Sequence, residues 1–236
     1  YTGKEEIVFS PNEHFLNQQG GAEQERVTDT SFRIIGIETK KYHLECQSTP
    51  DSSMLIRFFE YDAQIALDDG EVEGSTLTVT FPHSAVLFLR SNKNTPDKMK
   101  VTIQTPGGCA QYEIPVMKSV EYTIDEIFEK KLLFLIPFHI FSHERKFETY
   151  NNDESGLEKL KAEYEGIKNR LEEELDKGRI DEYTKCTVTD MSGKVLEHIA
   201  AKYERIKEGV KTVMGGKVLE YEAKNIRKAG LEEGLR

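Results

Sequence analysis

The sequence contains no run of about 20 apolar residues, the length that a membrane-spanning helix requires. The nearest approach is "LLFLIPFHIF" (132–141), which is shorter, is interrupted by Pro137 and is followed at once by polar and charged residues. We therefore interpret it as a buried helix or strand and expect no interaction with a membrane. We expect no signal peptide at the given N-terminus, although a truncated start would hide one. Because the chain begins at Tyr1 rather than Met, we expect it to be a fragment.

Cysteine is scarce, and its placement argues against two structural devices. The three cysteines, Cys46, Cys109 and Cys186, are odd in number, far apart and in no CxxC pattern. Disulfide frameworks and zinc sites built on cysteine both depend on paired or closely spaced cysteines, so we expect neither. Such usage favours a reducing, intracellular compartment, the cytoplasm.

An excess of positive charge is also missing. The formal net charge is −10, and residues 1–149, with 15 Lys and Arg against 23 Asp and Glu, carry −8 of it. Proteins that bind nucleic acid without sequence preference usually show the opposite balance, because their affinity comes largely from phosphate contacts. The net charge alone does not attract a polyanion, although a bound divalent cation would offset part of it.

What the sequence does contain is a succession of strand and helix patterns up to about residue 148. Apolar alternation and short apolar runs predict strands at 31–37, 41–47, 75–81, 84–90, 100–105 and 110–116. The run "AVLFL" in the fourth of these is typical of a strand buried on both faces. "PGG" (106–108) predicts a hairpin between the last two. Helical spacing predicts one helix between Pro50 and Gly70 and another from an N-cap at Thr123 to about Ile140.

From about Asn151 the sequence becomes helical. Large apolar residues recur with 3-4-3-4-4 spacing from Leu157 to Leu175, which predicts a long amphipathic helix ending at Gly178. One or two further helices follow, with breaks at Gly193 or Gly215-Gly216. We place a domain boundary at 148–153, between residues 1–148 and 149–236. The apolar stripe suits an antiparallel helical hairpin or a self-association seam, so this region could form a homodimer or bind a partner protein.

The strands 31–37 and 41–47 predict an antiparallel hairpin about the connector "ETK" (38–40). If paired residue numbers sum to about 78, Arg33 lies opposite Glu45, and the even-numbered side chains form the core face. The opposite face then collects Asp29, Ser31, Arg33, His43, Glu45 and Gln47. An edge hairpin with one solvated face explains this alternation. Alternatively, Asp29 and Glu45 converge because they hold a cation such as Mg²⁺ between them.

These residues resemble a known family. "TD" (28–29), an apolar strand, "HLECQ" (43–47) and a helix with "RFFEYDAQIAL" (57–67) are similar to the PD-(D/E)XK nuclease superfamily, over roughly residues 10–145. The greatest similarity is to its Rpn branch, bacterial recombination-promoting nucleases also described as transposase-like. The resemblance implies a restriction-endonuclease-like α/β fold, a mixed sheet flanked by helices, followed here by a helical C-terminal region.

The resemblance also implies a metal-dependent site. In that family the Asp and the Glu bind Mg²⁺, which Mn²⁺ can replace, together with a backbone carbonyl; here these would be Asp29, Glu45 and the carbonyl of Cys46. The metal lowers the pKa of a bound water and offsets charge on the scissile phosphate. Thr28 replaces the Pro of the motif, and Gln47 stands where a Lys is usual. A Gln can orient water by hydrogen bonds but brings no positive charge.

Several further residues have two interpretations. Arg33, His43 or Arg57 could supply the missing positive charge, and Arg57 with Tyr61 could bind phosphate and orient the site; the alternative is an exposed Arg beside a core Tyr. Glu13 is a possible additional metal ligand, and His43 suits a hydrogen-bond partner better than a ligand. The remaining candidates, His139 and His143, lie four apart beside Glu144 but form no HExxH pattern, so we interpret them as structural.

The sequence therefore predicts a Mg²⁺-dependent DNA endonuclease in which Asp29 and Glu45 hold the metal and Gln47 positions the attacking water. A competing hypothesis is a catalytically inactive descendant that acts as an interaction or regulatory module through its C-terminal helices. The acidic core and Gln47 favour that rival.

Overall fold

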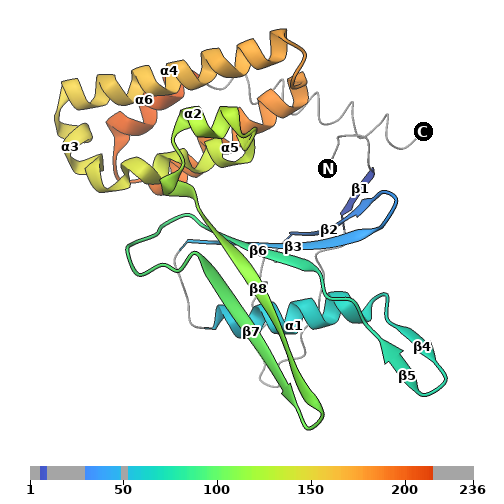
Figure 1. Cartoon of the computed structure of the whole chain (residues 1–236). Helices are drawn as coiled ribbons and strands as arrows, with labels where there is room; N and C mark the ends of the chain where they lie inside the picture. Colours follow the sequence, from blue (N-terminus) through green and yellow to red (C-terminus); the bar gives the residue numbers. More distant parts are fainter. Residues whose placement is uncertain (1–5, 10–29, 49–52, 215–236) are drawn as a thin grey trace, which may run out of the picture. The chain divides into compact units, whose positions relative to one another are not determined.

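The computed structural model describes residues 6–9, 30–48 and 53–214, and its contacts divide the chain into two compact units, 1–118 and 119–236 (Figure 1). The sequence pattern places its change of character later, at 148–153. The units divide earlier because the segment that begins at Ser119 packs against the helices that follow it.

The first unit combines one long helix with eight strands in the described residues. The helix α1 spans Met54–Leu67. The strands are β1 (Glu6–Phe9), β2 (Thr30–Ile35), β3 (Lys40–Gln47), β4 (Glu71–Glu73), β5 (Thr76–Thr78), β6 (His83–Phe88), β7 (Lys98–Thr105) and β8 (Gly108–Lys118).

Six of these strands form a mixed sheet in the order β1-β2-β3-β6-β8-β7. β3 pairs parallel with β6, and β6 pairs parallel with β8, while the remaining neighbours are antiparallel. The parallel β3–β6 pair needs a crossover connection, which α1 provides on one face of the sheet (Figure 1). The predicted α/β class is confirmed at this level, and so is the hairpin about "PGG". The strand predicted at 75–81 is shorter and pairs only with β4.

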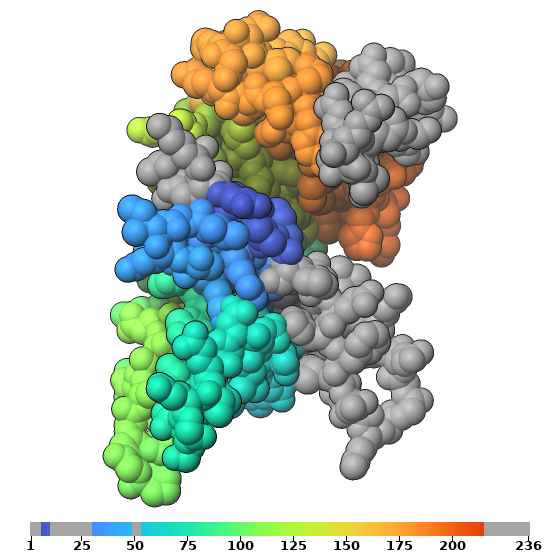
Figure 2. Space-filling model, turned by 90° about the vertical axis from the view of Figure 1, so that its right-hand side faces the viewer, coloured from blue at the N-terminus to red at the C-terminus, as the bar shows by residue number. Residues whose placement is uncertain are grey.

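The core of this unit lies between α1 and the sheet. Met54 and Phe58 from the helix pack against Val86, Phe88 and Ile114 from the strands, and all five are buried. The prediction that "AVLFL" is buried on both faces is confirmed, because consecutive side chains of β6 point to opposite faces and are buried alike. At the other end of the sheet β1 is exposed, and Figure 2 shows it beside β2 and β3 at the surface.

The hairpin β2–β3 has a different register from the predicted one. Paired residue numbers sum to 74 rather than 78, so that Phe32 faces Tyr42 and Arg33 faces Lys41 instead of Glu45. Two contacts explain this register. The rings of Phe32 and Tyr42 stack with centroids 5.2 Å apart. Arg33 and Lys41 both bind the carboxylate of Asp69, at 3.1 and 2.9 Å. The connecting loop is consequently longer than "ETK".

The prediction that the even-numbered side chains of this hairpin form the core face is wrong. His43 and Glu45 are buried, whereas Tyr42 and Leu44 are half-buried and Cys46 is exposed. The alternation itself is as expected, but α1 covers the odd-numbered face. The polar residues of β3 therefore lie inside the unit rather than on its surface.

The secondary structure of the second unit consists of helices alone within its described residues. Its elements are η1 (Ser119–Glu121), α2 (Ile124–Glu129), η2 (Leu133–Lys146), α3 (Phe147–Asn152), α4 (Glu154–Asp176), α5 (Glu182–Ile199) and α6 (Glu204–Met214), where η1 and η2 are 3₁₀ helices. Thr123 caps α2 as predicted: its hydroxyl accepts the N–H of Glu126, and the Glu126 carboxylate accepts the N–H of Thr123.

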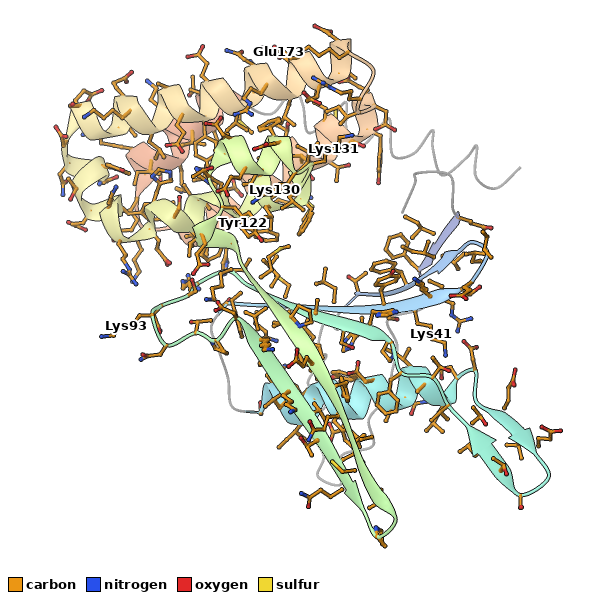
Figure 3. The ribbon with its side chains drawn as sticks, in the orientation of Figure 1. Lys41, Lys93, Tyr122, Lys130, Lys131 and Glu173 are labelled. Carbon is orange, nitrogen blue, oxygen red and sulfur yellow. The ribbon has the colours of Figure 1, made fainter. Side chains whose placement is uncertain are left out.

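The helix predicted from Thr123 to Ile140 is not continuous. Its first part, α2, ends at Glu129. Two residues later Lys131, labelled in Figure 3, adopts a left-handed conformation with φ of 57°. The N–H of Leu132 then donates to the carbonyl of Ile127 at 2.8 Å, which is the closing hydrogen bond of a Schellman motif. The chain resumes as the tighter η2, which contains Pro137.

The amphipathic helix predicted for 157–175 is confirmed as α4. Its stripe from Leu157 to Leu171 is buried, and the chain turns at Gly178 with φ of 65°. This stripe packs inside the unit, where α4 contacts α3, α5 and α6. A homodimer through the C-terminal helices stays a prediction. Gly193 lies within α5, so the predicted break there is wrong, and Gly215-Gly216 lies outside the described residues.

Across the described parts of both units, no helix combines the length and the apolarity that crossing a bilayer would require.

Candidate active site

The polar side chains of β3 gather beneath α1. Strand alternation sends His43, Glu45 and Gln47 to the same face, and helical spacing turns Arg57 and Tyr61 toward them. The structure thus brings together five of the residues that the sequence singled out. All five come from two consecutive elements, and their arrangement depends on how α1 packs on β3.

Glu45 is at the centre of this group and is 0% exposed. The Gln47 amide donates to its Oε2 at 3.3 Å, and Arg57 Nη2 lies 3.7 Å from the same oxygen. The Nε2 atom of His43 lies 3.9 Å from Oε1. A buried carboxylate is costly unless charge partners and donors surround it, and these groups serve that purpose.

His43 does not stand alone. Its Nδ1 lies 2.7 Å from Oδ1 of Asp62, and its ring packs between those of Phe58 and Tyr61. With the carboxylate ionised, the Nδ1–H is the donor, which leaves Nε2 directed to the Glu45 side. His43 is therefore a positioned neighbour of Glu45, in keeping with its interpretation as a hydrogen-bond partner.

Asp62 is fully buried and accepts hydrogen bonds from three elements. Besides His43, Ser84 Oγ donates to Oδ1 at 2.6 Å and the Tyr112 hydroxyl donates to Oδ2 at 2.9 Å. Burial, together with the Asp62 charge, raises the pKa of the Tyr112 phenol well above its usual range. Both carboxylate oxygens are thus occupied by protein donors, so Asp62 positions this group and is a poor metal ligand.

Sequence reasoning missed Asp62, Ser84 and Tyr112. A signal for the first was present, because Asp62 lies four residues after Phe58 and three before Ile65, on the buried stripe of α1. A carboxylate inside an apolar stripe requires partners. The sequence offers no comparable signal for Ser84 or Tyr112, since their proximity to Asp62 depends on strand order.

The guanidinium of Arg57 has N–H groups that make no hydrogen bond within the described residues. Its Nε and Nη2 atoms are buried and have no hydrogen-bond partner among the described residues, although Nη2 is within ion-pair distance of Glu45. A guanidinium in this state can donate hydrogen bonds to the oxygens of an anionic group. Tyr61 is buried with its ring edge-on to His43, as a core tyrosine would be.

The structure describes only some of the remaining predicted residues. Arg33 binds Asp69 and does not contact Glu45. Asp29 and Glu13 lie outside the described residues. Cys46 is exposed, and within the described ranges β2 pairs with β3 only as far as Leu44, so the end of β3 from Glu45 onward pairs only with β6.

Of the two buried carboxylates, Asp62 is occupied by protein donors, so the chemistry available here is that of the Glu45 carboxylate, an amide that can hold water and a guanidinium with donors that make no hydrogen bond within the described residues. Glu45 offers hard oxygen atoms, which Mg²⁺ prefers. Comparison with known proteins adds nothing to this description: no family model, no curated protein and no solved structure matches the chain.

Proposed function

We propose that this protein is a Mg²⁺-dependent DNA endonuclease of the PD-(D/E)XK type, with a restriction-endonuclease-like fold. The observation that carries the proposal is the grouping of Glu45, Gln47 and Arg57 where β3 runs beneath α1. In the sequence Asp29 immediately precedes β2, which is the antiparallel neighbour of β3. The proposal therefore places Asp29 with Glu45.

The donor set fits a hard divalent cation. Glu45 contributes carboxylate oxygen, Asp29 contributes a second carboxylate, and the carbonyl of Cys46 is the third candidate ligand. Mg²⁺, or Mn²⁺ in its place, would supply a Lewis acid that offsets phosphate charge and lowers the pKa of water. Its positive charge would also offset part of the negative charge that the first 149 residues present to DNA.

The chain's own residues would then share the remaining tasks. The Gln47 amide, already within hydrogen-bond distance of Glu45, orients the attacking water toward phosphorus. The buried, unused donors of Arg57 bind a non-bridging phosphate oxygen. His43, held by Asp62, fixes the direction in which the Glu45 carboxylate points.

Nicking of supercoiled plasmid by the full chain tests this proposal. We expect cleavage with Mg²⁺ or Mn²⁺ and none with EDTA. Asp29→Asn and Glu45→Gln should abolish it, and Gln47→Leu should reduce the rate by about 10²–10⁴-fold because water is no longer oriented. Glu60→Gln, on the exposed side of α1, is the matched control and should cleave like the wild type. A wild-type protein that leaves plasmid intact with both metals contradicts the proposal.

Arg57 can be tested separately by DNA binding. Arg57→Gln should weaken the binding of a duplex oligonucleotide and lower the slope of log K against log salt by about 1, which is the loss of one phosphate contact. Arg33→Gln is the control, because Arg33 is occupied by Asp69. Equal effects of the two variants would contradict a specific role for Arg57.

A second candidate function is a non-catalytic interaction module that keeps this polar group for stability alone. The complete burial of Glu45 favours it, because a buried and partnered carboxylate is also what a structural network requires. In that case Glu45→Gln should lower the melting temperature, the metals should not change the melting temperature of the wild type, and no variant should alter the plasmid.

A further inference from the structure

A cluster of histidine and glutamate lies in the second unit. His139 and His143 come from η2, and Glu163 comes from the middle of α4. His139 Nε2 lies 2.6 Å from one oxygen of Glu163, and His143 Nε2 lies 3.3 Å from the other. One ligand atom from each side chain falls within 4.8 Å of the other two.

Packing holds the cluster in place from several sides. His139 is 8% exposed, and its neighbours in η2 and α4, Ile140 and Tyr164, are buried. The two imidazole rings meet edge to face with centroids 5.3 Å apart, and the Tyr150 ring lies 6.0 Å from that of His143. The imidazoles are thus oriented by the fold and not by solvent.

His143 provides a second, independent observation. Its Nδ1 and Nε2 are both buried, and neither makes a hydrogen bond within the described part of the chain, although Nε2 lies close to Glu163. Buried polar atoms are nearly always satisfied, so such an imidazole calls for a partner beyond those that the described residues provide. A metal ion bound at Nε2 is one such partner.

We propose that His139, His143 and Glu163 form a binding site for Zn²⁺ or a chemically similar divalent transition metal. Two imidazoles and one carboxylate, with water in the fourth position, are an established tetrahedral ligand set for zinc. At metal–ligand distances of about 2.0–2.1 Å, tetrahedral ligand atoms lie about 3.3 Å apart. The His143–Glu163 distance already has this value, and the His139–Glu163 pair must open from its present hydrogen bond.

The ligand types separate this site from the one proposed around Glu45. Imidazole nitrogen suits Zn²⁺, Cu²⁺ and Ni²⁺, whereas Mg²⁺ prefers oxygen ligands in octahedral geometry. Two neutral imidazoles and one carboxylate also carry a net charge of −1. A bound divalent cation changes the net charge of the cluster to +1, so no excess of negative charge is buried.

A metal bound by His139, His143 and Glu163 would link η2 to α4 through shared coordination. A 3₁₀ helix has poorer hydrogen-bond geometry than an α-helix, and Pro137 removes one of the N–H donors of η2. A ligand that binds only the folded state stabilises it in proportion to its occupancy. The bound metal would therefore stabilise the folded second unit by linking η2 to α4.

Titration of the whole chain without a tag with Zn²⁺ tests the proposal, because a histidine tag would itself bind the metal. We expect one Zn²⁺ per chain at this cluster, with a dissociation constant that rises at least tenfold in both His143→Gln and Glu163→Gln. The matched controls are Glu165→Gln, two residues away on the exposed side of α4, and His198→Gln, an exposed histidine of α5. Both controls should bind Zn²⁺ like the wild type.

Two further readouts identify the ligands. Zinc X-ray absorption should show scattering from two imidazoles, and saturating Zn²⁺ should raise the melting temperature of the wild type and the controls but not of the two site variants. Glu163 is partly exposed, so Glu163→Gln keeps the test valid even if His143→Gln fails to fold. The absence of saturable Zn²⁺ binding, or affinity unchanged in Glu163→Gln, would overturn the proposal and leave an ion-pair cluster.

Discussion

His43 Nδ1 and Asp62 Oδ1 lie 2.7 Å apart between β3 and α1, and both residues are fully buried. This contact joins the strand that carries Glu45 to the helix that carries Arg57. Because Asp62 also accepts hydrogen bonds from β6 and β8, it links α1 to three strands of the sheet. Asp62 thus holds His43, whose Nε2 lies 3.9 Å from the Glu45 carboxylate, in a fixed position beside it.

Asp62→Asn should therefore be strongly destabilising. The amide cannot accept from all three donors, and leaving one of them buried and unpaired lowers the free energy of unfolding by about 2–4 kcal/mol. Asp68→Asn, at the exposed end of the same helix, should change it by less than about 0.5 kcal/mol. Urea denaturation of the two variants and the wild type measures this difference; equal stabilities would show that the Asp62 network contributes little.

The raised pKa of Tyr112 predicts how the free energy of unfolding changes at alkaline pH. Burial and the Asp62 charge raise the pKa of its phenol in the folded state above the usual value of 10.0. The unfolded chain loses this proton first as the pH rises above about 10, so unfolding releases a proton and the free energy of unfolding falls. Tyr112→Phe cannot titrate. The stability advantage of the wild type over Tyr112→Phe should therefore shrink between pH 8 and pH 11.

Tyr122→Phe is the control for that experiment, since Tyr122 belongs to the other unit and lies against Lys130 (Figure 3). The stability of Tyr122→Phe relative to the wild type gives the background for replacing a tyrosine outside the Asp62 network. A constant difference for Tyr112→Phe from pH 8 to pH 11 would mean that the raised pKa does not contribute to folding.

Two adjacent phenylalanines of α1 provide a matched test of the core. Phe58 is 0% exposed and packs against Val86 and His43, whereas Phe59 is 40% exposed. Phe58→Ala should cost about 3–5 kcal/mol, because it removes buried area and leaves a cavity. Phe59→Ala should cost less than about 1 kcal/mol, since much of its ring is already in water. Thermal unfolding followed by circular dichroism would reveal the contrast, and similar losses would place the core elsewhere.

Two glycines, one within α4 and one just after its C-terminus, provide a further test. Alanine substitutions at these two positions should change the free energy of unfolding in opposite directions. Gly178 has φ of 65° and Gly166 lies in the middle of the helix, and a Cβ at either position meets no atom within 4 Å. Gly178→Ala should destabilise by about 1 kcal/mol, because only the backbone conformation is strained. Gly166→Ala should stabilise by up to about 1 kcal/mol through helix propensity. Denaturant midpoints of both variants measure the signs, and two changes of equal sign would contradict the assigned helix end.

Local patterns determined much of the fold. The apolar stripe from Leu157 to Leu171 encoded α4, the run 85–89 encoded a strand buried on both faces, and Thr123 encoded a helix start. In each case the signal lies within a few consecutive residues. The end of α2 was missed because Lys131 in a left-handed conformation has no mark in the sequence comparable to a glycine.

In the candidate site, too, some features follow from local sequence patterns and others only from tertiary packing. Strand alternation by itself put His43, Glu45 and Gln47 on one face, and the helical repeat brought Arg57 and Tyr61 toward a common side. Only the tertiary structure decided that α1 covers this polar face, that Arg33 turns away to Asp69, and that Ser84 and Tyr112 join Asp62. Periodicity specifies which side chains share a face, but which face is buried depends on the packing of elements far apart in the chain.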